Sequence, residues 1–147
     1  MNHDTRRSFL RLSAAGLLAA SVPMLASAQA AAPVKNRALF QVTDNDPVRW
    51  NLILNNLHAI RESVGSEGIE IELVAYGPGV LMLGGDSAVK ERIAEAIKAG
   101  VVMNACQNTM RSLKLSPQEM LPEIGYVPSG VVEVMRKQQQ GWAYIRP

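Results

Sequence analysis

The sequence predicts an α/β fold, a three-layer α/β/α sandwich with a central, mostly parallel five-stranded sheet. Three observations support this prediction. Five short apolar segments bounded by turn residues are typical of strands. Segments with helical spacing of apolar residues separate them, which implies right-handed βαβ crossovers with helices on both faces of the sheet. Finally, 48% of the 147 residues are hydrophobic and 19% are charged, a composition that favours one packed domain.

The amino terminus is typical of an export signal. Arg6 and Arg7 precede a charge-free apolar stretch over residues 12–25, and Ala26-Ser27-Ala28 supplies the small-x-small pattern that a signal peptidase accepts. This arrangement resembles a twin-arginine (Tat) signal peptide, here residues 1–28. An uncleaved anchor is the alternative, although the stretch is shorter than the roughly 20 apolar residues that a membrane helix needs. We therefore expect a periplasmic protein with no membrane association after cleavage.

Cleavage after Ala28 changes the charge balance. Removing three arginines and one aspartate from the 15 basic and 13 acidic residues leaves twelve of each. A neutral chain has no positive field that would attract phosphate backbones or anionic lipids, so a nucleic-acid partner is not expected. The remaining chain divides into a disordered leader over residues 29–36 and a folded domain over residues 37–147.

The first strand and helix of the domain have clear boundaries. Residues 38–43 form an apolar run that ends in turn residues. Asp46 supplies a helix N-cap and Pro47 the first helical residue, and Gly65 is a plausible end of the helix. The buried face of this helix is predicted from apolar residues at spacings of four, three and four: Ile53, Leu57, Ile60 and Val64.

The second strand, residues 69–75, alternates apolar residues with Glu70 and Glu72. Alternation predicts that one face of this strand is partly solvated, as at the edge of a sheet. The strand ends at the breaker Tyr76-Gly77-Pro78-Gly79. The remaining elements are a helix capped by Asp86 or Ser87 and ending at Gly100, a strand over 101–105, a helix from Cys106, a capping box at 116–119, a strand over 124–127, a helix over 130–140 and a strand over 142–145.

The single cysteine is the main candidate for chemistry. In open α/β folds, ligands lie outside the carboxyl ends of the strands, and Cys106 stands where the third strand ends and a helix begins. The amides and dipole of a helix N-terminus favour a thiolate there. Asn104, Gln107, Asn108 and Thr109 add polar groups nearby. The alternative is a buried structural cysteine, because free cysteine often packs as a small hydrophobic residue.

One cysteine excludes an internal disulfide and any CxxC framework. The chemistry that remains is a single-thiol carrier, an intermolecular disulfide or a redox sensor. The Tyr76, Gly77, Pro78 and Gly79 turn is either a simple connection or one wall of a pocket beside Cys106. Arg146 follows the last strand and is a further candidate for the same edge.

Other kinds of site lack the necessary residues. One cysteine and one histidine in the mature chain, His58, give no metal-ligand cluster. Ser129 lacks a G-x-S-x-G elbow and is better explained as a helix N-cap. Gly77 and Gly79 supply two of the three glycines of a dinucleotide fingerprint. We therefore expect neither a metal nor an organic cofactor.

Three segments together resemble the DsrE/DsrF-like family. They are the cysteine motif Asn104–Arg111, the tail Val127–Pro147 and the turn Val74–Gly79. The resemblance spans the whole mature domain. It implies a parallel-sheet α/β sandwich, assembly as a homo-oligomer (trimer or hexamer), and one cysteine that holds a persulfide, here Cys106. The export signal is a departure, because the sulfur-relay partners of the best-understood members work in the cytoplasm.

Three functions follow as hypotheses. The first is an exported sulfur-handling protein, a sulfurtransferase or sulfur carrier, that carries sulfane sulfur on Cys106 between a donor and an acceptor protein. The second is a non-catalytic homo-oligomeric module that binds a small ligand or a protein, with an inert cysteine. The third is a sensor that forms a mixed disulfide through Cys106. Accessibility of the thiol in the native protein separates the first hypothesis from the second.

Overall fold

The computed structural model describes residues 35–147, so the predicted signal peptide and most of the predicted leader lie outside the described residues. The main elements are, in chain order, β1 (Asn36–Val42), α1 (Pro47–Val64), β2 (Ile69–Ala75), α2 (Lys90–Lys98), β3 (Val102–Cys106), α3 (Gln107–Leu113), β4 (Gly125–Val127), α4 (Gly130–Gln139) and β5 (Ala143–Ile145). Short 3-10 turns connect some of them, at Ser66–Gly68, Gly77–Leu83 and Pro117–Glu119. No helix within residues 35–147 is long and apolar enough to cross a membrane.

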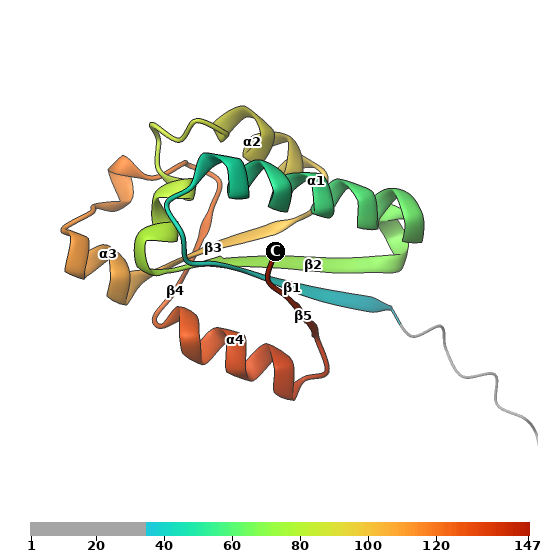
Figure 1. Ribbon diagram of the computed structural model, residues 1–147. Helices are drawn as coiled ribbons and strands as arrows, with labels where there is room; N and C mark the ends of the chain where they lie inside the picture. The colour runs from blue at the N-terminus through green and yellow to red at the C-terminus, as the bar shows by residue number, and fades with distance from the viewer. Residues whose placement is uncertain (1–34) are drawn as a thin grey trace, which may run out of the picture. The chain divides into compact units, whose positions relative to one another are not determined.

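The five strands form one sheet in the order β4-β3-β2-β1-β5, and all four pairings are parallel (Figure 1). Helices α1 and α2 lie on one face and α4 on the other. The predicted α/β class with a parallel five-stranded sheet is therefore confirmed. Because the last strand returns to lie beside the first, β1 is an interior strand and the edges are the three-residue strands β4 and β5.

The prediction that β2 lies at an edge is wrong, since β2 lies between β1 and β3. Glu70 is exposed, as alternation suggests, but only 3% of the surface of Glu72 is exposed. The Glu72 carboxylate lies 2.5 Å from Nζ of Lys137 and accepts a hydrogen bond of 2.9 Å from Asn104. The acidic alternation therefore reflects a paired charge beneath α4, and not a solvated strand.

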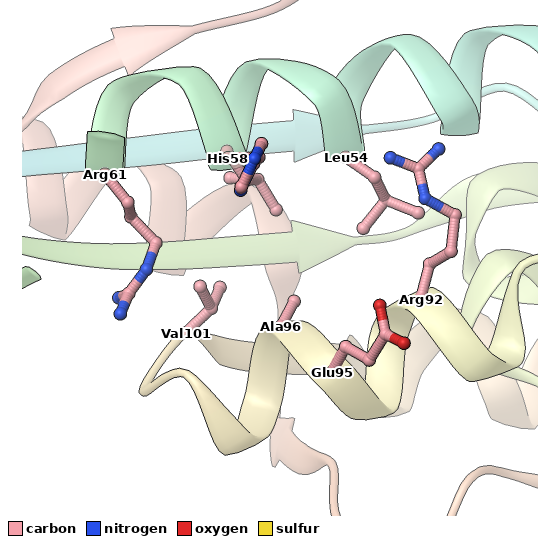
Figure 2. A pocket seen from close by; sticks show the side chains of 8 residues that line it. Leu54, His58, Arg61, Arg92, Glu95, Ala96 and Val101 are labelled. Carbon is pink, nitrogen blue, oxygen red and sulfur yellow. The ribbon is translucent and has the colours of Figure 1, made fainter. Parts of the chain in front are cut away.

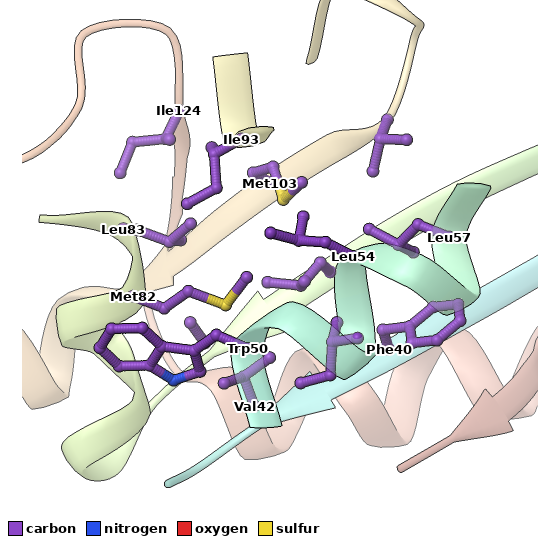
Figure 3. Close-up of a cluster of buried hydrophobic side chains, with 14 of the residues drawn as sticks. Phe40, Val42, Trp50, Leu54, Leu57, Met82, Leu83, Ile93, Met103 and Ile124 are labelled. Carbon is purple, nitrogen blue, oxygen red and sulfur yellow. The ribbon is translucent and has the colours of Figure 1, made fainter. Parts of the chain in front are cut away.

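The larger core fills the space between the sheet on one side and helices α1 and α2 on the other (Figure 3). Helix α1 begins as predicted, because the Asp46 side chain accepts the Val48 N–H at 2.9 Å and Pro47 is the first helical residue. Residues of β1 alternate between the two faces, so that Phe40 packs in this core and Leu39 under α4. The smaller cluster under α4 consists of Leu39, Val74, Val127 and Val134, with Tyr76 and Trp142 packed against it.

Helix α2 begins later than its sequence pattern predicts. Its N-cap is Val89, not Asp86 or Ser87, although the Ser87 hydroxyl accepts the Val89 N–H at 3.4 Å. The preceding residues pair elsewhere, since the Gly85 N–H donates to the Glu119 carbonyl at 2.8 Å. Residues 84–90 form successive turns instead, in which the Ser87 N–H donates to the Gly84 carbonyl at 3.0 Å and the Lys90 N–H to the Ser87 carbonyl at 3.2 Å.

The carboxyl ends of β3 and β4 form the point at which successive connections leave on opposite faces. After β3 the chain enters α3, whose Met110 packs in the core shared with α1 and α2. After β4 it enters α4 on the other face (Figure 1). Such a switch point opens a crevice at the strand ends, which is where ligands bind in open α/β sheets.

Candidate functional site

Cys106 lies at this end of the sheet. It is the last residue of β3 and the N-cap of α3. In the sheet it pairs with Val127 of β4, and on its other side Tyr76 follows the Ala75–Ala105 pair of β2 and β3. Only 4% of its surface is exposed. Its sulfur is therefore enclosed by groups from several elements that meet at the carboxyl end of the sheet.

The first turn of α4 provides the closest contact of the sulfur. The Gly130 N–H, at the first residue of α4, donates a hydrogen bond to Sγ of Cys106 at 3.2 Å. This N–H belongs to the group of amides that have no partner within their own helix. A negative charge on the sulfur is stabilised both by this bond and by the dipole of α4.

The pKa of the Cys106 thiol lies below its ordinary value. Burial by itself raises this pKa, because it penalises the charged thiolate. The Gly130 N–H opposes that effect, followed by the N–H and hydroxyl of Thr109 and the N–H of Asn108. The Asn108 N–H also donates to the Pro128 carbonyl at 3.3 Å, so its effect on the sulfur is shared. The balance favours the nucleophilic thiolate.

Gly130 is required at its position by a close approach. A Cβ built on Gly130 would lie 2.7 Å from Cδ1 of Tyr76, closer than any side chain tolerates. The ring of Tyr76 therefore packs directly against the residue whose amide contacts the sulfur. This packing joins the end of β2 to the start of α4 beside Cys106.

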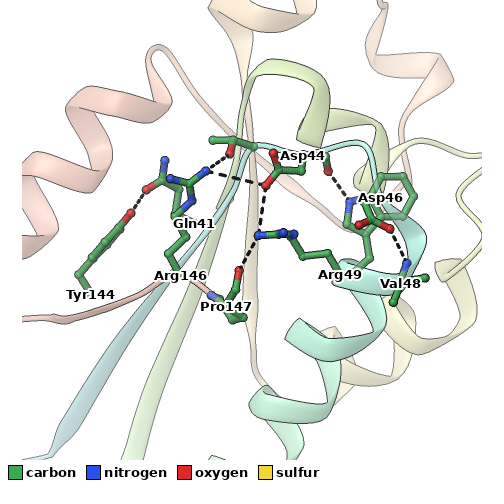
Figure 4. Close-up of polar contacts among 10 residues, drawn as sticks. Gln41, Asp44, Asp46, Val48, Arg49, Tyr144, Arg146 and Pro147 are labelled. Carbon is green, nitrogen blue, oxygen red and sulfur yellow. Dashed lines mark hydrogen bonds and ion pairs between the residues drawn. The ribbon is translucent and has the colours of Figure 1, made fainter.

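A hydrogen-bonded row extends from Tyr76 across two further strands. The Gln41 side-chain amide donates to the Tyr76 hydroxyl, and the Tyr144 hydroxyl donates to the Gln41 carbonyl oxygen. Figure 4 shows the contact between Gln41 and Tyr144. Burial raises the pKa of Tyr76, and the neighbouring Tyr144 raises it further, whereas Arg146 lowers it. Tyr76 therefore remains protonated at neutral pH.

The Tyr76-Gly77-Pro78-Gly79 turn is only partly directed at the cysteine. The Gly77 N–H donates to the Thr109 hydroxyl at 3.0 Å, which ties the turn to α3. Gly79 faces the end of β1, where a Cβ would lie 2.6 Å from the Val42 carbonyl oxygen. Pro78 is exposed. Tyr76 and Gly77 thus lie at the Cys106 site, and Gly79 anchors the turn to β1.

The side chains of Asn104, Gln107 and Asn108 make contacts away from the sulfur. Asn104 lies two residues before Cys106 and on the same face of the sheet. Its side chain donates a hydrogen bond to Glu72. Gln107 is exposed and lines a cavity of about 200 Å³ with Tyr126. The Asn108 side chain accepts from Arg111, so only its backbone N–H faces the thiol.

Several contributors to the site have weak or absent sequence signals. Thr109, predicted above as a polar neighbour of Cys106, is the exception, because it is the third residue of a helix whose N-cap is Cys106, and N-cap side chains accept from that position. Gly130 is 24 positions from Cys106 and Gln41 is 35 positions from Tyr76. No local pattern joins residues at such separations.

Arg146 lies at the same edge of the sheet but beside β1. It donates to the Thr43 hydroxyl at 3.0 Å and lies 3.8 Å from the Asp44 carboxylate (Figure 4). Arg49 also approaches Asp44, at 3.7 Å. These contacts hold the end of β5 against the end of β1.

A separate cavity of about 300 Å³ lies between α1 and α2, and none of the predicted site residues lines it (Figure 2). His58 stands at its rim, exposed and 3.2 Å from Glu62. Arg92 crosses from α2 to α1, where it donates to the side chains of Asn51 and Asn55. Within residues 35–147, no group of three or more His, Cys, Asp or Glu side chains is arranged to hold a metal ion.

Known proteins resemble this chain in sequence and fold. The model of the DsrE/DsrF-like family matches residues 40–147. A protein of unknown function from Methanobacterium thermoautotrophicum is 35% identical, with a TM-score of 0.73 over 76% of this chain and 99% of its own. A conserved protein of unknown function from Bacteroides thetaiotaomicron, 14% identical, has a TM-score of 0.64 over 80% of this chain and 99% of its own, and shows likeness of fold alone. No curated protein matches the chain. Because the family model spans most of the sequence, the chain belongs to the DsrE/DsrF-like family.

Proposed function

We propose that this protein is a sulfur carrier that holds sulfane sulfur as a persulfide on Cys106. The observation that carries the proposal is the N–H of Gly130, directed at a thiol whose pKa is lowered. A purely structural cysteine has no need of an N–H donor at a helix start. Membership of the DsrE/DsrF-like family supports the same chemistry.

The chemistry needs no metal and no organic cofactor. The Cys106 thiolate attacks the outer sulfur of a donor persulfide, the donor's S–S bond breaks, and the donor leaves as a thiolate. The transferred sulfur keeps its proton, so Cys106 becomes Cys–S–SH. An acceptor thiolate then attacks that outer sulfur, and Cys106 leaves as a thiolate. The N–H groups around Sγ stabilise the same anion in both steps, as nucleophile and as leaving group.

The proposal is tested by loading the mature protein with inorganic polysulfide and measuring its intact mass. We expect a gain of about 32 Da, one sulfur atom, that dithiothreitol removes. Alkylation of the unloaded thiol, followed against pH, should give an apparent pKa below about 8.5, the ordinary thiol value. The Cys106→Ser protein is the control. Sulfur retained by that variant, or a wild-type protein that never gains mass, contradicts the proposal.

The burial of Cys106, with 4% of its surface exposed, favours the alternative of a binding module with an inert cysteine. In that case the thiol reacts only when the protein unfolds. Alkylation that requires denaturant, together with the absence of sulfur loading, would select this function.

We further propose that the protein acts in the periplasm after Tat export and assembles as a homo-oligomer. The twin arginine and the small-x-small site support export. Apolar side chains on the outer surface of α4 support assembly, since 60% of Val131 and 48% of Met135 is exposed. A donor and an acceptor of sulfur would then be exported proteins or small sulfur compounds.

A further inference from the structure

The Cys106 sulfur is closed off on every side that the contacts define. Val127 pairs with Cys106 in the sheet, Gly130 donates to the sulfur, Thr109 lies in the first turn of α3, and the Tyr76 ring packs against Gly130. Because only 4% of the residue is exposed, no alkylating reagent or sulfur donor reaches Sγ unless one of these groups moves.

Three of the four groups are fixed by the backbone. Val127 pairs directly with Cys106 in the sheet. Gly130 is part of α4, and Thr109 is part of α3, where its hydroxyl is fixed by the Gly77 N–H. Moving any of them breaks a strand pairing or a helix.

Tyr76 differs from the other three groups. It follows the last pair of the β1–β2 ladder, is partly exposed, and touches Gly130 through its side chain alone. Its backbone N–H stays bonded to the Val42 carbonyl at 3.0 Å, so the ring can rotate about its side-chain bonds without disturbing the sheet. Displacing this ring therefore costs less free energy than displacing any of the other three groups.

Besides its packing against the smaller apolar cluster and Gly130, the ring is held by a row of two polar side chains. Gln41 is buried and bonds the Tyr76 hydroxyl with its amide nitrogen and the Tyr144 hydroxyl with its amide oxygen. Tyr144 lies on the short edge strand β5 and is exposed. The row therefore connects the buried side of the cysteine site to the surface of the molecule.

We propose that Tyr76 is the side chain that moves to admit reagents to Cys106, and that Gln41 and Tyr144 are positioning residues that keep it closed. When the hydroxyl leaves Gln41, the ring turns away from Gly130 and uncovers Sγ while Val127, Gly130 and Thr109 remain in place. A persulfide formed there is covered again when the ring returns. The carrier of the proposed function would thus be protected between loading and release.

The test measures the rate of iodoacetamide alkylation of Cys106 in native wild-type protein and in Gln41→Leu and Tyr144→Phe variants. Loss of one hydrogen bond of ordinary strength should raise the population of the open form, and the rate, about fivefold. The rate should stay nearly constant up to about 0.5 M guanidinium, since turning one ring exposes little surface. Tyr126→Phe is the matched control, because Tyr126 has no side-chain hydrogen bond within residues 35–147.

The proposal is overturned if both variants react at the wild-type rate, or if Tyr126→Phe accelerates the reaction equally. A rate that rises steeply with guanidinium also overturns it, because the thiol would then be reached by global unfolding. Alkylation requires no sulfur transfer, so a protein that opens through Tyr76 yet gains no sulfur contradicts only the proposed function.

Discussion

At the scale of single residues, Cys106 shows how the pKa of a nearly buried thiol is kept low. Burial and hydrogen bonding act on its pKa in opposite directions, and the N–H groups prevail. Backbone donors cannot be titrated away and carry no side-chain entropy, so the lowering of the thiol pKa persists wherever the protein is folded. The most important of them, on Gly130, comes from a residue with no side chain.

Replacing Gly130 with alanine should disturb both the stability and the thiol. The new methyl group would collide with the Tyr76 ring, which should lower the free energy of unfolding by about 1–3 kcal/mol. Displacement of the Gly130 N–H should raise the pKa of Cys106, which alkylation against pH will show. Gly68→Ala is the control, because its nearest contact is the flexible side chain of Val64. An unchanged pKa in Gly130→Ala would mean that this N–H is not the main stabiliser of the thiolate.

At the scale of elements, helix α4 depends on an ion pair for its attachment to the sheet. Lys137 contacts Glu72 at 2.5 Å and Glu133 at 3.8 Å, and its Nζ lies 4.4 Å from the centre of the Trp142 ring. Since α4 also carries Gly130, the ion pair at its carboxyl-terminal half and the thiol contact at its first residue lie on one rigid helix. The position of the helix therefore links the two.

Removing the cation should be costly. Lys137→Met leaves the Glu72 carboxylate buried without its partner, and we expect a loss of about 3–5 kcal/mol in the free energy of unfolding. The double variant with Glu72→Gln should recover part of that loss. Arg136→Met, one position away and exposed, should change stability by less than about 0.5 kcal/mol. Urea denaturation of the wild type and the three variants measures these free energies of unfolding. Equal losses of stability at positions 136 and 137 would contradict the argument.

The positions of helices and strands along the chain were easier to predict from the sequence than the elements that pack beside each of them. The strand segments, the start of α1 at Asp46-Pro47 and the start of α3 at Cys106 follow from local patterns of apolar residues and caps. The place of β2 inside the sheet did not, because the side chains that neutralise Glu72 come from β3 and α4. For the same reason Cys106 could be selected as a candidate, but neither Gly130 nor Gln41 could be placed beside it.

At the scale of the whole molecule, the two faces of the sheet are covered unequally. Helices α1 and α2 lie on one face, where Met110 of α3 also packs in the core, while α4 covers the other. Val102 of β3, whose neighbours Met103 and Ala105 belong to the larger core, is 51% exposed. Parallel sheets are normally covered on both faces, so this open area and the apolar surface of α4 are consistent with the proposed homo-oligomer.

Sedimentation velocity of the mature protein tests this assembly. We expect a mass several times that of one chain, and Met135→Glu should shift the population towards the monomer by placing a charge in an apolar contact. Gln139→Glu, on the same helix but polar already, should leave the distribution unchanged. A wild-type protein that remains monomeric at all concentrations excludes the homo-oligomer. Export is tested separately, since replacing Arg6 and Arg7 with lysines should retain the precursor inside the cell.

The pairing of β1 with β5 has a consequence for how the chain is made. Ala38 pairs with Ala143, so the first strand stays without its outer neighbour until β5 has been synthesised. Such a long-range contact forms late and slowly, so the sheet is completed only after β5 has been synthesised. Because the twin-arginine route moves folded proteins, the proposed signal suits a domain whose sheet is complete only when β5 has joined β1.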